Sequence, residues 1–460
     1  MTTGNAYSLV EAGEREHELL SAIRQMEPDK NLRLPGQIYL WPFVINFFSP
    51  WASYRPTVSV KVVDPQFGNI SASVLGFESD PTQMMVRGLA YGLALVLFIG
   101  RFQASLRLLA KQPIYVLLVI YILLSMLWSA FPQKVFINFG HSVGMGLVAL
   151  SLLFYYEKRY AEIYFFLARI LSPIILASLL LCLLFPAYGI AYDGRWQGVF
   201  LNSNSLGLLC LISVWASAAS LTVNSQRSIR RWSWTFLTLG LVAVFGSRSV
   251  TSITLSLFVM LGIPALLALR KNPRPVQIIK ILMALLVGLI LFASVIVFTP
   301  ERLEWQEIFA LFGRSTTLTG RTTVWAGALE LIHLRPWLGW SFDSNLSVLG
   351  NLIGQSGQFH NGYLDLLVRG GWIGLTLALW LVLAIFKGLV SVSKIESKTS
   401  ICILVIVLAI LFHNITEASL VRETNLLWML LVVSYFSIGV FRQKTLKMET
   451  RNDMSNQLNS

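Results

Sequence analysis

The chain has 460 residues and a net charge of +13, with 55% hydrophobic but only 13% charged residues. A soluble domain of ordinary composition has about 25% charged residues, so this composition excludes a soluble globular protein and predicts helices that are apolar all round and face lipid. The basic excess does not indicate a nucleic-acid partner, because no basic stripe with interleaved aromatic residues lies outside the apolar stretches.

The chain begins with a polar, charged stretch, and no apolar core of a cleavable signal peptide follows a short basic start. We expect residues 1–35 to form a cytoplasmic N-terminal tail. An aromatic-rich stretch at 38–54, interrupted by Pro42 and Pro50, is a weak candidate span. Most of the clear apolar runs that follow have close to the roughly 20 residues that cross a bilayer as a helix. They lie at 85–102, 113–131, 134–155, 162–187, 205–223, 231–246, 249–269, 277–299, 370–391, 400–416 and 424–441.

The predicted fold is therefore all-α: a polytopic transmembrane helical bundle of about 12 spans. We expect residues 36–299 to hold spans 1–9 and residues 370–441 to hold spans 10–12. Between them, residues 300–369 would form one large periplasmic loop containing short helices. Residues 442–460 would form a cytoplasmic C-terminal tail.

Basic residues recur in alternate loops of this arrangement, so that all of these groups fall on one side of the membrane. By the positive-inside rule that side is cytoplasmic, which places both termini of the multi-pass protein in the cytoplasm. The groups are Arg101/Arg107/Lys111, Lys158/Arg159, Arg227/Arg230/Arg231, Arg270/Lys271/Arg274, Lys387/Lys394/Lys398 and Arg442/Lys444/Lys447.

Three arginines lie on the opposite side, where the same rule disfavours them. Arg195 is in the loop after the fifth span, Arg248 is in a tight turn between two spans, and Arg321 is in the long loop. His360 lies near the end of that loop, close to the next span. Because guanidinium groups bind phosphate through paired hydrogen bonds, this convergence predicts an anion site at the outer face.

Each of these residues also has a plainer interpretation. An outer arginine can anchor a helix at the membrane interface or pair with a carboxylate, and a lone histidine often serves packing. Spacing does not exclude other participants, namely Arg314, Arg335, Arg369, His333 and His413.

A short helix is predicted at 319–332 in the long loop, with Pro336 as its stop. Trp325, Ala328, Leu329 and Ile332 share one face at helical spacing. That face can pack against the protein, or Trp325 can stack on a sugar ring.

The three cysteines, Cys182, Cys210 and Cys402, each lie within an apolar run and are interpreted as small core residues. The sequence contains no metal-binding or nucleotide-binding motif, so no metal and no cofactor are expected.

The outer segments resemble the O-antigen ligase and polysaccharide polymerase superfamily of bacterial inner membranes, and they are most similar to its exopolysaccharide polymerase branch. The likeness covers about residues 85–441, and four motifs occur in the family's order, separated by spans. Residues 341–359 match no motif of the family. The motif residues are Arg195-Trp196-Gln197-Gly198-Val199-Phe200 with Asn202 and Asn204; Ser247-Arg248-Ser249; Gly320-Arg321-Thr322-Thr323-Val324-Trp325 with Arg335-Pro336-Trp337-Leu338-Gly339-Trp340; and His360-Asn361-Gly362-Tyr363-Leu364 with Gly371 and Gly374.

The resemblance implies a glycosyltransferase of the bacterial inner (plasma) membrane that uses neither metal nor nucleotide sugar. Its donor would be an undecaprenyl-pyrophosphate-linked glycan, and its acceptor a glycan or a lipid-linked glycan. Other polysaccharide assembly and export proteins would be its partners in the bilayer.

The resemblance also implies roles for single residues. His360 would take the proton of the acceptor hydroxyl, and Arg248 and Arg321 would stabilise the leaving pyrophosphate. The substrate-binding set would be Arg195, Asn202, Asn204, Asn361 and Trp325.

Three activities stay open at this point. The first is a polymerase that joins lipid-linked repeat units, and the second is a ligase that passes a finished glycan to lipid A-core or to protein. The third is a transporter or flippase of lipid-linked oligosaccharide. Transporters usually place polar groups on broken helices near the bilayer midplane and in repeated halves, whereas these charges lie at helix ends and no internal repeat is visible.

Overall fold

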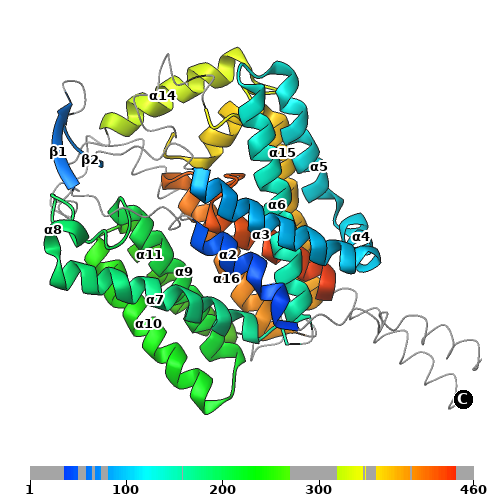
Figure 1. The fold of residues 1–460 in the computed structure, drawn as a ribbon, viewed down its shortest axis with the longest axis vertical. Coiled ribbons are helices and arrows are strands. Elements are labelled where there is room, and N and C mark those ends of the chain that lie inside the picture. The colour runs from blue at the N-terminus through cyan, green and yellow to red at the C-terminus, as the bar shows by residue number, and fades with distance from the viewer. Residues whose placement is uncertain are drawn as a thin grey trace, which may run out of the picture.

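The computed structural model describes residues 36–49, 59–64, 68–73, 81–157, 159–269, 319–345, 348, 359–393 and 396–441. Over these residues the protein is a bundle of helices with one small β-hairpin (Figure 1). The helices are η2 (Gly36–Leu40), α2 (Trp41–Phe48), α3 (Pro81–Gly100), α4 (Phe102–Lys111), α5 (Pro113–Leu124), η4 (Ser125–Trp128), α6 (Pro132–Tyr156), α7 (Glu162–Leu184), α8 (Pro186–Gly189), α9 (Ser203–Val223), α10 (Arg227–Ser247), α11 (Val250–Leu269), α14 (Thr319–Leu334), α15 (Gly362–Val392), α16 (Ser397–Thr416) and a last helix at Leu426–Phe441.

The hairpin pairs β1 (Ser59–Asp64) with β2 (Gly68–Ser73) in antiparallel register, Ser59 lying opposite Ser73. The prediction of a helical membrane bundle is confirmed, and the hairpin is an element that the sequence analysis did not predict.

Seven helices of the described part are long and apolar enough to cross a membrane, namely α3, α6, α7, α9, α11, α15 and α16. Helix α4 and the run Pro113–Trp128 form a further pair, bent by 89°, that counts as at most one broken span. The chain is therefore a multi-pass membrane protein. The total of about 12 stays a prediction, because the predicted span at 277–299 lies outside the described residues.

Two predicted spans form shorter helices than expected. The candidate at 38–54 gives the apolar helix Gln37–Phe48, and the candidate at 424–441 gives Leu426–Phe441. At about 1.5 Å per residue, both fall short of a hydrocarbon core of about 30 Å. The last helix is nevertheless almost entirely buried, so its place is inside the bundle rather than against lipid.

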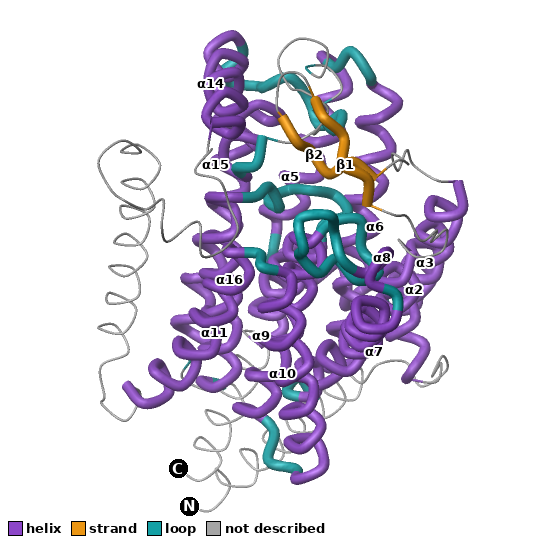
Figure 2. Tube along the Cα trace, turned by 90° about the vertical axis from the view of Figure 1, so that its left-hand side faces the viewer, coloured by secondary structure: helices purple, strands orange, loops and turns teal. Residues whose placement is uncertain are grey.

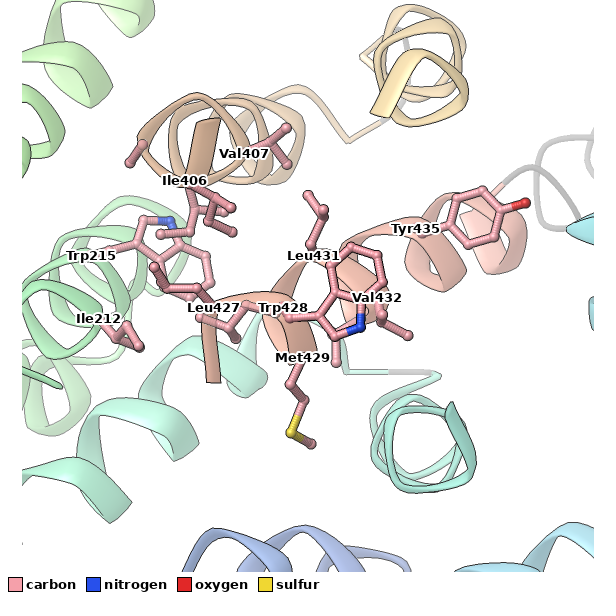
Figure 3. Close-up of a cluster of buried hydrophobic side chains, with 14 of the residues drawn as sticks. Ile212, Trp215, Ile406, Val407, Leu427, Trp428, Met429, Leu431, Val432 and Tyr435 are labelled. Atoms are coloured by element: carbon pink, nitrogen blue, oxygen red, sulfur yellow. The ribbon is translucent and has the colours of Figure 1, made fainter. Parts of the chain in front are cut away.

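Helix α16 and the last helix form the centre of the bundle, whereas α3 is largely exposed at its edge. Figure 3 shows their packing: Trp215 of α9 lies beside Ile406 of α16, and Leu427 and Trp428 of the last helix fill the space next to them. The Trp215 indole N–H donates to the Cys402 carbonyl at 2.9 Å. Because lipid tails are as apolar as leucine, such close packing and hydrogen bonding hold membrane helices together.

Because consecutive helices run in opposite directions, the ends of several helices lie together at one end of the bundle. Helices α10 and α16 finish at the same end of the bundle at which α9, α11 and α15 begin, and we call this the site end. Thr251 of α11 and Thr416 of α16 meet there, with their hydroxyl oxygens 2.9 Å apart. The opposite end carries basic residues, and there Arg101 pairs with Glu157 at 3.5 Å between Nη1 and Oε2.

Helix α15 starts at Gly362 and breaks at Gly371, whose φ of 59° and ψ of −164° are not helical. The predicted span start at residue 370 therefore falls on this break, and one helical turn or more of α15 precedes it. The turn at Gly339, which has a φ of +67°, packs into the break, because a Cβ on Gly371 would lie 2.7 Å from the Gly339 nitrogen. Only a residue without a side chain adopts this backbone in so little space.

We expect Gly371→Ala to lower the free energy of unfolding by about 1–3 kcal/mol, because alanine is strained at this φ and meets backbone atoms. The midpoint of thermal unfolding in detergent measures the effect. Gly88→Ala in α3 is the matched control, since its Cβ would meet nothing within 4 Å. Equal midpoints for the two variants would contradict the assigned strain.

Candidate functional site

Glu417 joins two of the predicted site residues at the site end. Its Oε2 lies 3.2 Å from Nδ1 of His360, and its Oε1 accepts a hydrogen bond of 3.2 Å from the Asn204 amide. The His360 and Glu417 side chains are 28% and 15% exposed, so this pair is half-buried rather than free in solvent. Two distant segments of the chain therefore meet at the carboxylate of a third.

The position of His360 is set by the start of α15. Its neighbour Asn361 caps this helix by accepting hydrogen bonds from the Tyr363 and Leu364 backbone N–H groups at 3.0 and 3.1 Å. The Asn361 amide also donates to the Ile415 carbonyl at 3.2 Å, which fixes the start of α15 against the end of α16. His360 itself has a φ of 50°, a left-handed conformation in which histidine is enriched.

Arg195 and Arg248 lie at a second corner of the site end. The Trp196 backbone N–H donates to the Gly246 carbonyl at 2.9 Å, which attaches the Arg195 loop to the last turn of α10. Arg248 ends that helix with a left-handed φ of 46°, and its Nη1 lies 3.9 Å from where a Cβ on Gly194 would be. The Arg195 loop and the Arg248 turn are therefore neighbours.

The two guanidinium groups differ in their surroundings. Arg195 donates from Nε to Asp193 Oδ2 at 2.7 Å, so part of its charge is compensated within its own loop. Arg248 is exposed, and no carboxylate of the described residues forms an ion pair with it. Arg248 is thus the guanidinium with its donors open to an anionic ligand.

The pair Arg195 and Arg248, here called the arginine corner, lies next to the pair His360 and Glu417, here called the histidine corner. Thr251, one turn after Arg248, contacts Thr416, which directly precedes Glu417. Helix α9 fits closely between them, because a Cβ on Gly207 would lie 2.8 Å from the side chains of Ser249 and Ser252. A cluster of connecting loops lies above α9 and α16 in this region (Figure 2).

The remaining predicted residues have other placements. Asn202 caps α9 by accepting from the Ser205 N–H at 2.8 Å, so its side chain serves the helix start. Trp325 of α14 donates from Nε1 to the Phe359 carbonyl at 2.9 Å and so contacts the residue before His360. Arg321 belongs to the first turn of α14, but its side chain lies outside the described part of the chain.

The alternative participants are engaged elsewhere or buried where they are described, and His413 lies nearest, its carbonyl accepting from the Glu417 N–H at 2.9 Å. Arg369 is 1% exposed and pairs with Glu423 at 2.8 Å, and Arg335 stacks on the Trp340 ring at 4.3 Å. His413 is buried inside the last turn of α16, and His333 is exposed on α14. Arg314 lies outside the described residues. Among the residues that the structure describes, no group of three or more His, Cys, Asp or Glu is arranged to hold a metal ion.

Glu417 is the residue that the sequence analysis missed. The positive-inside rule singles out cations on the outer side, and a single carboxylate there does not stand out. The available signal was its position: it directly follows the last turn of an apolar helix that ends with His413 and Thr416.

Comparison with known proteins finds two similarities. Residues 234–379 match the family model described as O-antigen ligase, a stretch that includes Arg248, Arg321 and His360. The chain is also similar to the exopolysaccharide production protein ExoQ of Rhizobium meliloti (strain 1021), with 28% identity over 230 residues. The similar region covers 46% of this chain and 51% of ExoQ, so the chain spans about half the length of that relative.

The two matches confirm the resemblance to the O-antigen ligase and polysaccharide polymerase superfamily. Arg195 and Glu417 lie outside the family match, and the structure brings them to the residues inside it.

The contact between the two corners can be tested by cross-linking. We expect the double variant Thr251→Cys/Thr416→Cys to form a disulfide on mild oxidation, because the two hydroxyl oxygens are 2.9 Å apart. Mass spectrometry of the digested protein measures the linked peptides.

Thr238→Cys/Thr416→Cys is the matched control, because Thr238 lies at mid-length on an exposed face of α10. Linkage no greater than in this control would show that the arginine and histidine corners do not meet.

Proposed function

We propose that the protein is a glycan polymerase of the bacterial inner membrane. It transfers an oligosaccharide from an undecaprenyl-pyrophosphate carrier to a hydroxyl of a second lipid-linked repeat unit, on the periplasmic face, and so builds exopolysaccharide or O-antigen. The observation that carries this proposal is the His360–Glu417 pair beside Arg248, a base and an anion-binding group at one helix-end cluster.

The contact with Glu417 gives His360 a defined role in the transfer. A carboxylate at 3.2 Å from Nδ1 favours the tautomer that carries its proton there. The opposite nitrogen, Nε2, is then the acceptor that takes the proton of the incoming hydroxyl. Proton transfer to a placed base of this kind contributes about 10²–10⁴-fold to a rate.

The arginines would act on the leaving group. As the acceptor oxygen forms its bond to the anomeric carbon, the bond from that carbon to the pyrophosphate oxygen breaks, and the pyrophosphate leaves with the electron pair. Preplaced guanidinium donors stabilise this charge as it develops. We assign this role to Arg248 and Arg321, with Arg195 binding the donor, and attack opposite the leaving group would invert the anomeric centre.

The ligase remains the alternative, because the family model that matches is described as O-antigen ligase. The same base and the same anion-binding group would serve a finished glycan passed to lipid A-core or to protein. The two activities differ in the intermediate that accumulates when transfer stops.

We expect His360→Ala and Arg248→Ala each to abolish long polymer at unchanged protein level. His360→Ala should lower the transfer rate by about 10²–10⁴-fold, since it removes the base. The lipid-linked glycans of the cells are extracted and sized. Single lipid-linked repeats should accumulate, whereas accumulated long chains would show the ligase instead. Arg335→Ala, which removes an exposed arginine stacked on Trp340, is the control. Normal polymer length in both site variants would disprove the catalytic assignment.

Glu417 is proposed to position His360 rather than to touch substrate. We therefore expect Glu417→Ala to lower kcat at least tenfold with little change in the KM for the donor, and Glu417→Asp to restore part of the loss. Turnover of purified protein with a lipid-linked donor provides both constants.

A purely structural role would give a different pattern. In that case Glu417→Ala and Asn204→Ala would lower stability and both constants together, because each removes one side of the same hydrogen bond.

A further inference from the structure

A separate polar cavity of about 460 Å³ lies beside the site, between the first turns of α3 and α6 and the loop that follows α16. Figure 1 shows α3 and α6 running next to each other in this part of the bundle. Ten of its thirteen lining residues are polar, and the volume is in the usual range for small-molecule sites. None of the residues proposed for catalysis lines it.

The cavity has an excess of positive charge. Arg422 and Glu423 line it, but each is already paired: Arg422 contacts Asp365, and Glu423 contacts Arg369. Arg87 and Lys134 then remain, and among the described residues neither forms an ion pair.

Arg87 uses only part of its hydrogen-bonding capacity on the protein. Its Nε donates to the Ser49 hydroxyl at 2.9 Å, so the guanidinium is held by its inner nitrogen. The two terminal nitrogens form no hydrogen bond with described residues and can present a fork to a phosphate. Lys134 supplies a second positive charge from the facing helix α6.

The wall of the cavity is fixed in place. Asn138 donates to the Phe342 carbonyl at 2.7 Å and to the Ser344 hydroxyl at 3.0 Å, which binds the 341–345 loop to α6. Tyr91 and His141 meet one turn deeper, with the phenol oxygen 3.3 Å from Nδ1. A ligand would therefore meet a preformed polar surface.

The cavity lies next to surface that faces lipid. Helix α3 is largely exposed at the edge of the bundle: Met85 and Leu89, on the side of the helix turned away from Arg87, are 76% and 64% exposed, although both are apolar. A ligand with a polar head in the cavity and a hydrocarbon tail along α3 would satisfy both surfaces.

The cavity lies next to the His360–Glu417 pair. Ala418, which lines it, directly follows Glu417, and Asp365, which contacts the lining residue Arg422, lies one turn after His360. A ligand held in the cavity would thus lie beside the base but outside the Arg248 corner.

We propose that this cavity binds the phosphate headgroup of a second lipid, the pyrophosphate of the lipid-linked acceptor. The inference depends on the proposed polymerase function, because a polymerase joins two substrates that each carry a lipid pyrophosphate. Two such anions repel each other and need separate sets of cations. Arg248 serves the donor in this arrangement, and Arg87 with Lys134 serves the acceptor.

The test counts bound lipids without turnover. The purified full chain in phosphatidylcholine nanodiscs is titrated with undecaprenyl pyrophosphate, and native mass spectrometry reports the number bound. We expect two lipids on the wild type and one on Arg87→Gln/Lys134→Gln, with the affinity at the second site falling at least about tenfold. The charge-retaining variant Arg87→Lys/Lys134→Arg should keep two, and so should Arg107→Gln/Lys111→Gln, which removes two cations of α4.

Three outcomes would overturn the proposal. The first is an unchanged number and affinity of bound lipids on Arg87→Gln/Lys134→Gln. The second is undecaprenol binding as tightly as the pyrophosphate, since the site would then recognise only the tail. The third is inorganic pyrophosphate binding as tightly as the lipid, since the ligand would then be a soluble phosphate.

The failure of this inference differs from the failure of the proposed function. If His360→Ala blocks polymer but the lipid count does not depend on Arg87 and Lys134, only the acceptor site is wrong. If His360→Ala leaves polymer normal, the proposed function is wrong whatever the lipid count.

Discussion

The arrangement of the site end depends on one carboxylate, Glu417, at the end of α16. It contacts His360 at the start of α15 and Asn204 at the start of α9, so a single side chain fixes the distance between three helix ends. A buried or half-buried carboxylate is stable only with such partners, because its charge must be compensated where water is scarce. The same requirement that holds Glu417 also holds the imidazole in one orientation. The structural role of Glu417 and its proposed role in positioning His360 therefore coincide.

Close packing of helix ends makes this geometry possible. Side chains fill the space around Gly207, Gly246 and Gly362, where an added Cβ would meet neighbouring atoms well inside normal contact. Bulky residues at these positions would keep α9, α10 and α15 apart from their neighbours, and the polar groups beyond them would not reach each other. Small residues at helix contacts are the usual means of close approach in membranes. The hydrogen bonds of the site are thus made at the ends of helices whose apolar bodies already touch.

Sequence reasoning predicted those parts of the fold that depend on local pattern. The apolar runs gave most of the helices, and the 319–332 stretch with Pro336 gave α14, observed at Thr319–Leu334. The approach of Arg195 to Arg248 followed from topology, since both lie between spans on the same side. The roles of Arg195, Arg248, Arg321 and His360 remain predictions.

Other features depend on contacts between distant segments, which no local pattern records. Glu417 is unremarkable in sequence, and only folding places it against His360, 57 positions earlier in the chain. The 89° bend after α4 and the early start of α15 at Gly362 were missed for the same reason, because hydropathy alone does not show where an apolar run turns. Asn202 and Asn361 were expected to orient the site or the sugar, and in the structure both cap a helix, a role that their position before a helix also predicts. Their contact with substrate stays a prediction.

A protein that joins two anionic lipids has an electrostatic problem that a single binding site does not solve. Two pyrophosphates held by the same arginines would repel each other and would place both lipids on one side of the base. The structure separates the cations: Arg248 lies on the α10–α11 turn, whereas Arg87 and Lys134 lie on α3 and α6. At the cavity, the charges of Asp365, Arg369, Arg422 and Glu423 compensate one another, and Glu417 adjoins the cavity through Ala418. In the proposed polymerase, this arrangement would keep each phosphate with its own cations and leave the imidazole between them, where a hydroxyl of one lipid-linked glycan would reach the anomeric carbon of the other.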